Sequence, residues 1–106
     1  MTDLIVILTT MPDDPRADAL ARTLVEERLA ACVHIHAAAS STYRWRDAVE
    51  CESERPVVVK TTRAMRPAVE ARLRALHPYQ VPEFVVLAAE AADDYGRWLN
   101  DVVGPR

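Results

Sequence analysis

Residues 77–83 place an imidazole, a phenol and a carboxylate within one short connection. Two prolines, Pro78 and Pro82, fix their own φ angles and bias the residues before them toward extended conformations. Because imidazole binds metal ions and carries protons near neutral pH, His77 is the first candidate for a functional residue. The structural alternative is a rigid turn between a helix and a strand, in which the imidazole hydrogen-bonds to nearby backbone; residue types alone favour that alternative.

A second group of potential metal ligands alternates along one predicted strand. Cys32, His34 and His36 lie two residues apart and therefore project to the same face. A thiolate with two imidazoles is a plausible ligand set for copper or zinc. The alternative is that Cys32 is a small buried hydrophobic residue and that both histidines are polar residues of a sheet edge.

Several residues could line a cleft for a small ligand. Tyr43 and Trp45 share one face of a predicted hairpin and could stack on a ligand, or could pack at a protein interface. Three glutamates, at 50, 52 and 54, also alternate; they could collect a hard cation or form a solvated edge. Lys60 lies between apolar neighbours, so it must extend to water or find a carboxylate or an anionic ligand.

The elements that position these side chains follow from hydrophobic periodicity. Continuous apolar runs predict buried strands, and apolar residues at helical spacing predict helices. The predicted order is strand, helix, strand, strand, helix, strand and a final helix, with the strands at about 4–8, 31–45, 48–60 and 84–89. This order predicts an α+β, ferredoxin-like sandwich. Trp98 is expected in the core beneath the last helix.

The second and third strands are predicted to form one long hairpin. With Arg46 and Asp47 as a two-residue turn, position 45 faces 48 and position 42 faces 51. Cys32 then lies roughly 33 Å from Cys51 along the strand, so a disulfide within the chain is excluded. Arms of this length are expected to project beyond the body of the domain.

The strands near residues 4–8, 57–59 and 84–89 are apolar on both sides. One layer of helices covers only one face of a sheet, so the other apolar face predicts an interface. Together with the projecting hairpin, this pattern predicts an oligomer of the chain with itself.

Composition narrows the classes of function. The chain has 106 residues, half of them apolar, and a net charge of −3, so we expect a single domain over residues 1–106. We expect no nucleic-acid partner because no basic cluster is present, and no membrane partner because no apolar run spans a bilayer. The N-terminal segment lacks a positively charged region, which predicts a cytoplasmic protein. Two glycines are too few for a nucleotide-binding loop, and no set of nucleophile and base indicates an enzyme.

Six segments together resemble the CutA divalent-cation tolerance proteins over nearly the whole chain. They are 10–13 (TMPD), 27–33 (ERLAACV), 41–45 (STYRW), 59–62 (VKTT), 77–83 (HPYQVPE) and 95–99 (YGRWL). The resemblance implies a ferredoxin-like subunit in a tight homotrimer, with the long hairpins embracing neighbouring subunits. It also implies binding of Cu²⁺ or another divalent cation, a role in metal tolerance, no organic cofactor and no catalysis.

The resemblance also implies where copper ligands are expected. The family pattern has a cysteine where this chain has Thr9 and a histidine pair where it has Leu76 and His77, so only His77 is kept. Cys32 fits a family segment, whereas His34 stands where asparagine is common, and these residues with His36 form a hypothetical relocated metal site. By analogy with PII-type regulators, the alternative is a sensor binding a small anionic ligand between subunits. Its cleft residues are Lys60, Tyr43, Trp45, Tyr79 and Glu83. A metal-independent oligomeric scaffold is a third reading.

Overall fold

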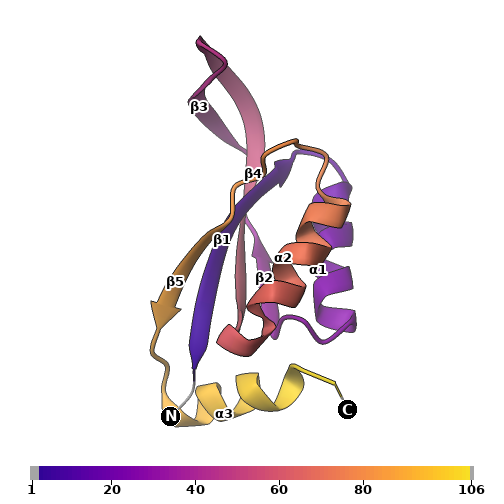
Figure 1. Cartoon of the computed structure of the whole chain (residues 1–106), viewed down its shortest axis with the longest axis vertical. Helices are drawn as coiled ribbons and strands as arrows, with labels where there is room; N and C mark the ends of the chain where they lie inside the picture. Colours follow the sequence, from indigo (N-terminus) through magenta and orange to yellow (C-terminus); the bar gives the residue numbers. More distant parts are fainter. Residues whose placement is uncertain (1–2, 106) are drawn as a thin grey trace.

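The computed structural model describes residues 3–105. The first two residues of the N-terminal segment, from which a cytoplasmic location was predicted, lie outside the described residues. The chain runs through a strand, a helix, three successive strands, a short 3₁₀ helix joined to a second helix, a fifth strand and a last helix (Figure 1). The strands are β1 (Leu4–Pro12), β2 (Cys32–Ile35), β3 (Ala39–Trp45), β4 (Ala48–Thr62) and β5 (Val85–Ala89). The helices are α1 (Arg16–Glu26), the short 3₁₀ helix η1 (Arg63–Met65), α2 (Arg66–Leu76) and α3 (Asp93–Val102).

The strands form one antiparallel sheet with the order β2-β4-β1-β5, and β3 pairs with the other half of β4. Helices α1 and α2 cover one face, while α3 lies across one end of the molecule (Figure 1). The predicted α+β, ferredoxin-like arrangement with a long hairpin and a C-terminal helix is therefore confirmed.

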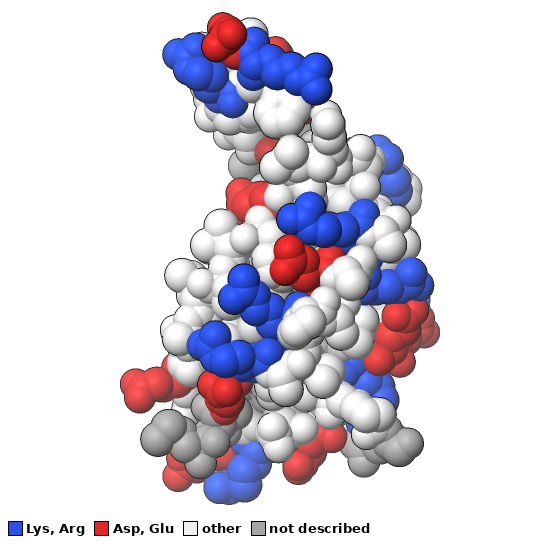
Figure 2. Space-filling view, viewed as in Figure 1, with Lys and Arg blue, Asp and Glu red and all other residues white. Residues whose placement is uncertain are grey.

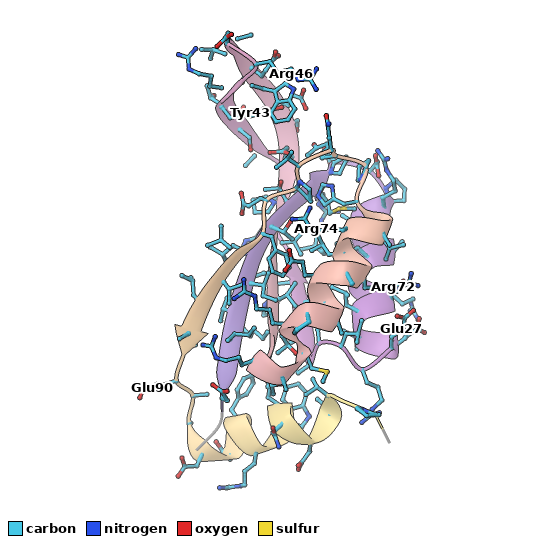
Figure 3. The ribbon with its side chains drawn as sticks, in the orientation of Figure 1. Glu27, Tyr43, Arg46, Arg72, Arg74 and Glu90 are labelled. Carbon is cyan, nitrogen blue, oxygen red and sulfur yellow. The ribbon has the colours of Figure 1, made fainter. Side chains whose placement is uncertain are left out.

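The main core lies between the sheet and the helix pair. Ile5 and Ile7 of β1 point to this side and are fully buried. They pack with Val57 and Val59 of β4 and with residues of both helices (Ala17, Leu20, Leu24, Val69 and Leu73). At the surface, Arg72 of α2 binds Glu27 at the end of α1, with an Nη2–Oε2 distance of 2.8 Å (Figure 3). A smaller cluster of Leu4, Ala31 and Leu99 holds α3 to the opposite face.

The predicted long second strand is wrong in one respect, because it is divided into β2 and β3. Ile35 pairs with Val57, but Ala39 pairs with Glu54, so the segment 36–38 contains one residue more than the segment facing it. This is a β-bulge, and it coincides with Pro56, which has no N–H to donate to the ladder. The backbone N–H of His36 instead donates to the carbonyl oxygen of Pro56 at 2.9 Å.

Beyond the bulge, β3 and the first half of β4 form a ribbon that projects from the body (Figure 1). The predicted turn is confirmed: Trp45 pairs with Ala48 and Thr42 with Cys51. Arg46 and Asp47 have φ angles of 49° and 66°, as a type I′ turn requires, although neither residue is glycine. The turn gives the ribbon the twist of the sheet.

The second face of the sheet stays partly uncovered. Val85 and Leu87 of β5 are 44% and 47% exposed, and their neighbours on this face are Leu8 and Val6 of β1. The margin of the molecule formed by β5 is largely uncharged (Figure 2). The core position predicted for Trp98 is wrong: its side chain is 45% exposed, because α3 turns Leu99 rather than Trp98 toward the sheet.

Candidate functional site

His77 is an anchor of the 77–83 loop. It follows the last residue of α2 in an extended conformation, as expected before a proline, and its side chain is buried. Its Nε2 donates to the carbonyl oxygen of Thr10 at 2.7 Å, and its Nδ1 accepts the backbone N–H of Tyr79 at 3.1 Å. The neutral Nε2–H tautomer satisfies both bonds. His77 thus ties the loop to the end of β1.

The positions that the family resemblance assigns to copper do not fit a metal ion here. Thr9 is 1% exposed and faces the core, and Leu76 packs against the main hydrophobic cluster. Both ring nitrogens of His77 are already hydrogen-bonded, so a metal ion would have to replace one of these bonds. The structural alternative for His77, a backbone-bonded turn residue, describes its contacts.

Tyr79 and Thr10 meet at a buried carboxylate. Glu54 lies in β4 and is 6% exposed; its Oε2 accepts a hydrogen bond from Thr10 Oγ1 at 3.3 Å. The Tyr79 hydroxyl also hydrogen-bonds to Glu54. Burial, and then this bond to a carboxylate, raise the pKa of Tyr79 above its ordinary value. The His77 ring packs against Tyr79 with centroids 4.8 Å apart, which holds the phenol in place.

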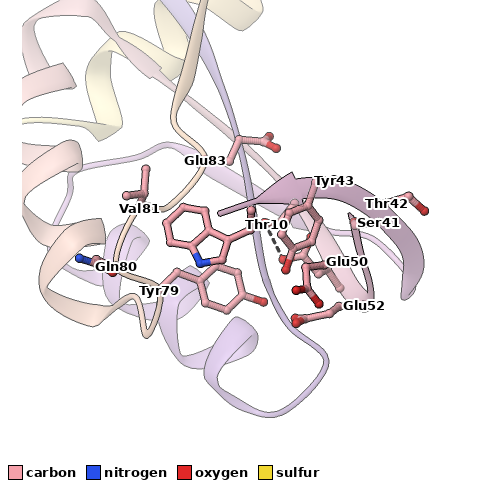
Figure 4. A pocket seen from close by; sticks show the side chains of 12 residues that line it. Thr10, Ser41, Thr42, Tyr43, Glu50, Glu52, Tyr79, Gln80, Val81 and Glu83 are labelled. Carbon is pink, nitrogen blue, oxygen red and sulfur yellow. Dashed lines mark hydrogen bonds between the residues drawn. The ribbon is translucent and has the colours of Figure 1, made fainter. Parts of the chain in front are cut away.

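Thr10, Glu54 and Tyr79 form one wall of a cavity of about 710 Å³ between the ribbon and the 77–83 loop. The structure brings four of the predicted cleft residues together here: Tyr43, Trp45, Tyr79 and Glu83. Tyr43 and Tyr79 converge on the carboxylates of Glu50 and Glu52 (Figure 4).

The register of the ribbon explains this convergence. Tyr43 pairs with Glu50, and Ser41 pairs with Glu52, and paired residues of antiparallel strands project to the same face. Burial and the neighbouring carboxylates, Glu52 first, raise the pKa of Tyr43. Arg46 Nη2 donates to Gln80 Oε1 at 3.1 Å, so the tip of the ribbon contacts the loop.

Within one chain, Lys60 does not line this cavity. It pairs with Cys32 of β2 and Val6 of β1 in the body of the sheet, away from the ribbon. Its Nζ lies 5.9 Å from the ring centroid of Tyr95 in α3, where the aromatic ring stabilises the ammonium group. Within one chain the bulge and the ribbon carry Tyr43 and Trp45 beyond the sheet, so the prediction that Lys60 joins them in a cleft between subunits stays a prediction.

The relocated metal site is only partly assembled. Cys32 Sγ and His34 Nε2 lie 3.7 Å apart on the uncovered face of β2. His36 lies beyond the end of β2, where the bulge interrupts the alternation. Within residues 3–105, no group of three or more histidine, cysteine and acidic side chains is arranged to hold a metal ion. Both cysteines are free.

Sequence reasoning missed the roles of Thr10 and Glu54. Their contact joins residues 44 positions apart and has no local pattern. The opposition of Tyr43 and Glu50 did have a signal, because the predicted turn that pairs position 42 with 51 also pairs 43 with 50.

Comparison with known proteins gives a consistent result. The family model described as CutA1 divalent ion tolerance protein matches residues 5–102. A Thermus thermophilus protein named Divalent-cation tolerance protein CutA is 45% identical over 100 residues, covering 93% of this chain and 97% of its own. The crystal structure of CutA from Xylella fastidiosa superposes with a TM-score of 0.93 at 38% identity, covering 97% and 100% of the two chains.

A structure of lower sequence identity is described with a cellular compartment. The Archaeoglobus fulgidus protein is described as a periplasmic divalent cation tolerance protein, with a TM-score of 0.91 at 26% identity over 95% of this chain and 99% of its own. Among the helices of residues 3–105, none has the length and apolar character needed to cross a bilayer.

Proposed function

The chain belongs to the CutA1 divalent ion tolerance family, and we propose that it serves metal tolerance by binding copper or another divalent cation without catalysing a reaction. The observation that carries this proposal is the pairing of Cys32 and His34 on β2. Sulfur and imidazole nitrogen are the donors that copper and zinc prefer.

The geometry of this pair suits chelation. Zinc–sulfur and zinc–nitrogen bonds of about 2.3 and 2.0 Å at a tetrahedral angle hold the two donor atoms about 3.5 Å apart. Cys32 Sγ and His34 Nε2 are 3.7 Å apart, so both can bind one ion with little rearrangement. His34 is exposed and Cys32 is partly exposed, which leaves the ion accessible. Water or a group of a neighbouring subunit completes the coordination.

A titration with Zn²⁺ tests the pair, because Zn²⁺ has no redox chemistry and leaves the thiol intact. We expect Cys32→Ser and His34→Gln each to weaken binding by tenfold or more in calorimetry on the full chain. The matched controls are Cys51→Ser, the second free thiol, and His36→Gln, which lies outside β2. Competition with Cu²⁺ then ranks the ions. Equal binding by all four variants, or none by wild type, contradicts the proposal and favours the metal-independent scaffold.

We also propose that the protein is a homotrimer, as the family resemblance implies. The exposed apolar residues Val85, Leu87 and Trp98 support burial against another copy of the chain. The ribbon supports it too, because a projecting two-stranded ribbon is marginally stable without further packing. A trimer mass in light scattering is the expected result, and a monomer at micromolar concentration contradicts it.

For location we propose the cytoplasm, where free thiols such as Cys32 and Cys51 are kept reduced. The Archaeoglobus relative described as periplasmic makes this a point to test. Cell fractionation that recovers the protein with periplasmic markers contradicts it.

A further inference from the structure

We infer that the cavity between the ribbon and the 77–83 loop binds a small organic cation, of the kind that carries ammonium groups along a flexible chain. The cavity, about 710 Å³ in volume, lies within the range usual for small-molecule sites, roughly 300–1,000 Å³. Its walls come from three separate segments: the end of β1, the ribbon, and the loop that His77 anchors.

Charge is the first argument. The carboxylates of Glu50, Glu52, Glu54 and Glu83 line the cavity, and none of the lining residues that the structure describes is a lysine or arginine. Glu54 is 6% exposed, and its bonds come from the hydroxyl groups of Thr10 and Tyr79. It takes part in no ion pair within residues 3–105. A carboxylate buried without a cation is costly, so a cationic ligand supplies the missing charge.

The aromatic walls are the second argument. Tyr43, Trp45 and Tyr79 line the same space as the carboxylates. Trp45 already accepts one cation, since the Arg46 guanidinium carbon lies 5.3 Å from its ring centroid. Aromatic faces attract ammonium groups in the same way, and combining rings with carboxylates is suited to organic cations.

The spacing of the carboxylates argues against a metal ion. Glu50, Glu52 and Glu54 alternate along one strand, where residues two apart are separated by about 6.6–6.8 Å. Accordingly, no group of three such residues in the described chain converges on one point. A row of separated negative charges fits a chain of separated positive charges. The same carboxylates repel anions, so the lining of this cavity within one chain favours a cation over an anion.

Spermidine is a suitable probe, tested by calorimetry on the full-length protein. We expect it to bind, and we expect Glu54→Gln to weaken binding by about 10- to 100-fold, because the substitution removes the negative charge that faces the ammonium group and leaves only a neutral hydrogen-bond acceptor. Glu50→Gln is a second variant on the more exposed part of the ribbon, and Trp45→Leu tests the aromatic wall. The matched control is Glu90→Gln, a carboxylate far from the cavity (Figure 3).

Three outcomes overturn the inference. They are absence of spermidine binding, equal loss in Glu90→Gln and Glu54→Gln, and binding of Mg²⁺ at these glutamates in preference to spermidine. The inference is independent of the proposed metal site, because Cys32→Ser is expected to leave spermidine binding unchanged. Failure of either one therefore leaves the other standing.

Discussion

The imidazole of His77 donates a hydrogen bond of 2.7 Å to the backbone carbonyl oxygen of Thr10, which lies 67 residues earlier in the chain. This bond holds the loop after α2 against the end of β1, where Thr10 also contacts Glu54. The residue that sequence reasoning placed first among the ligands therefore positions the cavity wall that carries Tyr79.

Replacing His77 with alanine is expected to lower the free energy of unfolding by about 1–3 kcal/mol, because the part-buried carbonyl oxygen of Thr10 loses its 2.7 Å hydrogen bond from His77 Nε2. Urea denaturation measures the change. The control is His36→Ala, an exposed histidine for which we expect a change within about 0.5 kcal/mol. Equal effects of the two substitutions contradict an anchoring role for His77.

Stability is expected to fall at alkaline pH in a way that depends on Tyr79. Burial and the bond to Glu54 raise its pKa above the ordinary value of 10.0, so the unfolded chain loses this proton at lower pH than the folded chain does. The contribution of Tyr79 to the free energy of unfolding is therefore constant below about pH 10 and is lost as pH rises above that value. Denaturation between pH 9 and 11.5, roughly spanning the ordinary pKa, measures the loss. Tyr79→Phe is expected to reduce this loss of stability at alkaline pH, and Tyr95→Phe serves as the control. If Tyr79→Phe leaves the dependence of stability on alkaline pH unchanged, Tyr79 is not its source.

A charge placed on the uncovered sheet face is expected to prevent association between copies of the chain. Val85→Asp places a carboxylate on an exposed apolar surface and, if this surface is buried between copies, the charge prevents association. We expect a monomer in size-exclusion chromatography with light scattering. Val81→Asp is the matched control, since Val81 is 64% exposed but lies in the loop. Dissociation by Val81→Asp alone locates the interface elsewhere.

The turn of the ribbon stores backbone strain. Asp47 has a φ angle of 66°, a conformation that glycine adopts without the steric penalty of a side chain. The hydrogen bond between Arg46 and Gln80 does not involve the Asp47 side chain, so replacing Asp47 leaves that bond in place. Asp47→Gly is therefore expected to raise the free energy of unfolding by a few tenths to about 1 kcal/mol. Asp13→Gly, at a residue without positive φ, is expected to give no gain. A melting temperature that falls with Asp47→Gly contradicts the strain argument.

Much of the fold was predictable because its signals are local. The β-branched run of β1 and the helical spacing of α1 and α2 report burial directly, and the Arg46-Asp47 turn fixed the pairing of Thr42 with Cys51. The break between β2 and β3 was missed, although Pro56 marks it. The missing backbone N–H of Pro56 interrupts the pairing of strands, but where it does so depends on which residues face it in the neighbouring strand.

The exposure of Trp98 was missed for a related reason. Periodicity gives the apolar stripe of a helix, but not which part of that stripe contacts the sheet. In α3 that contact is made by Leu99, and Trp98 is left at the surface.

The sequence by itself determined the order of elements, the hairpin turn, the family and the loop that carries His77, because each depends on residues close together in the chain. Tertiary structure alone decided how these parts combine. It brought Thr10, Glu54 and Tyr79 together from three segments, occupied both nitrogens of His77, and separated Lys60 from Tyr43 and Trp45. Contacts between distant residues depend on register and on the bulge, and a shift of one residue reverses the face to which a side chain projects.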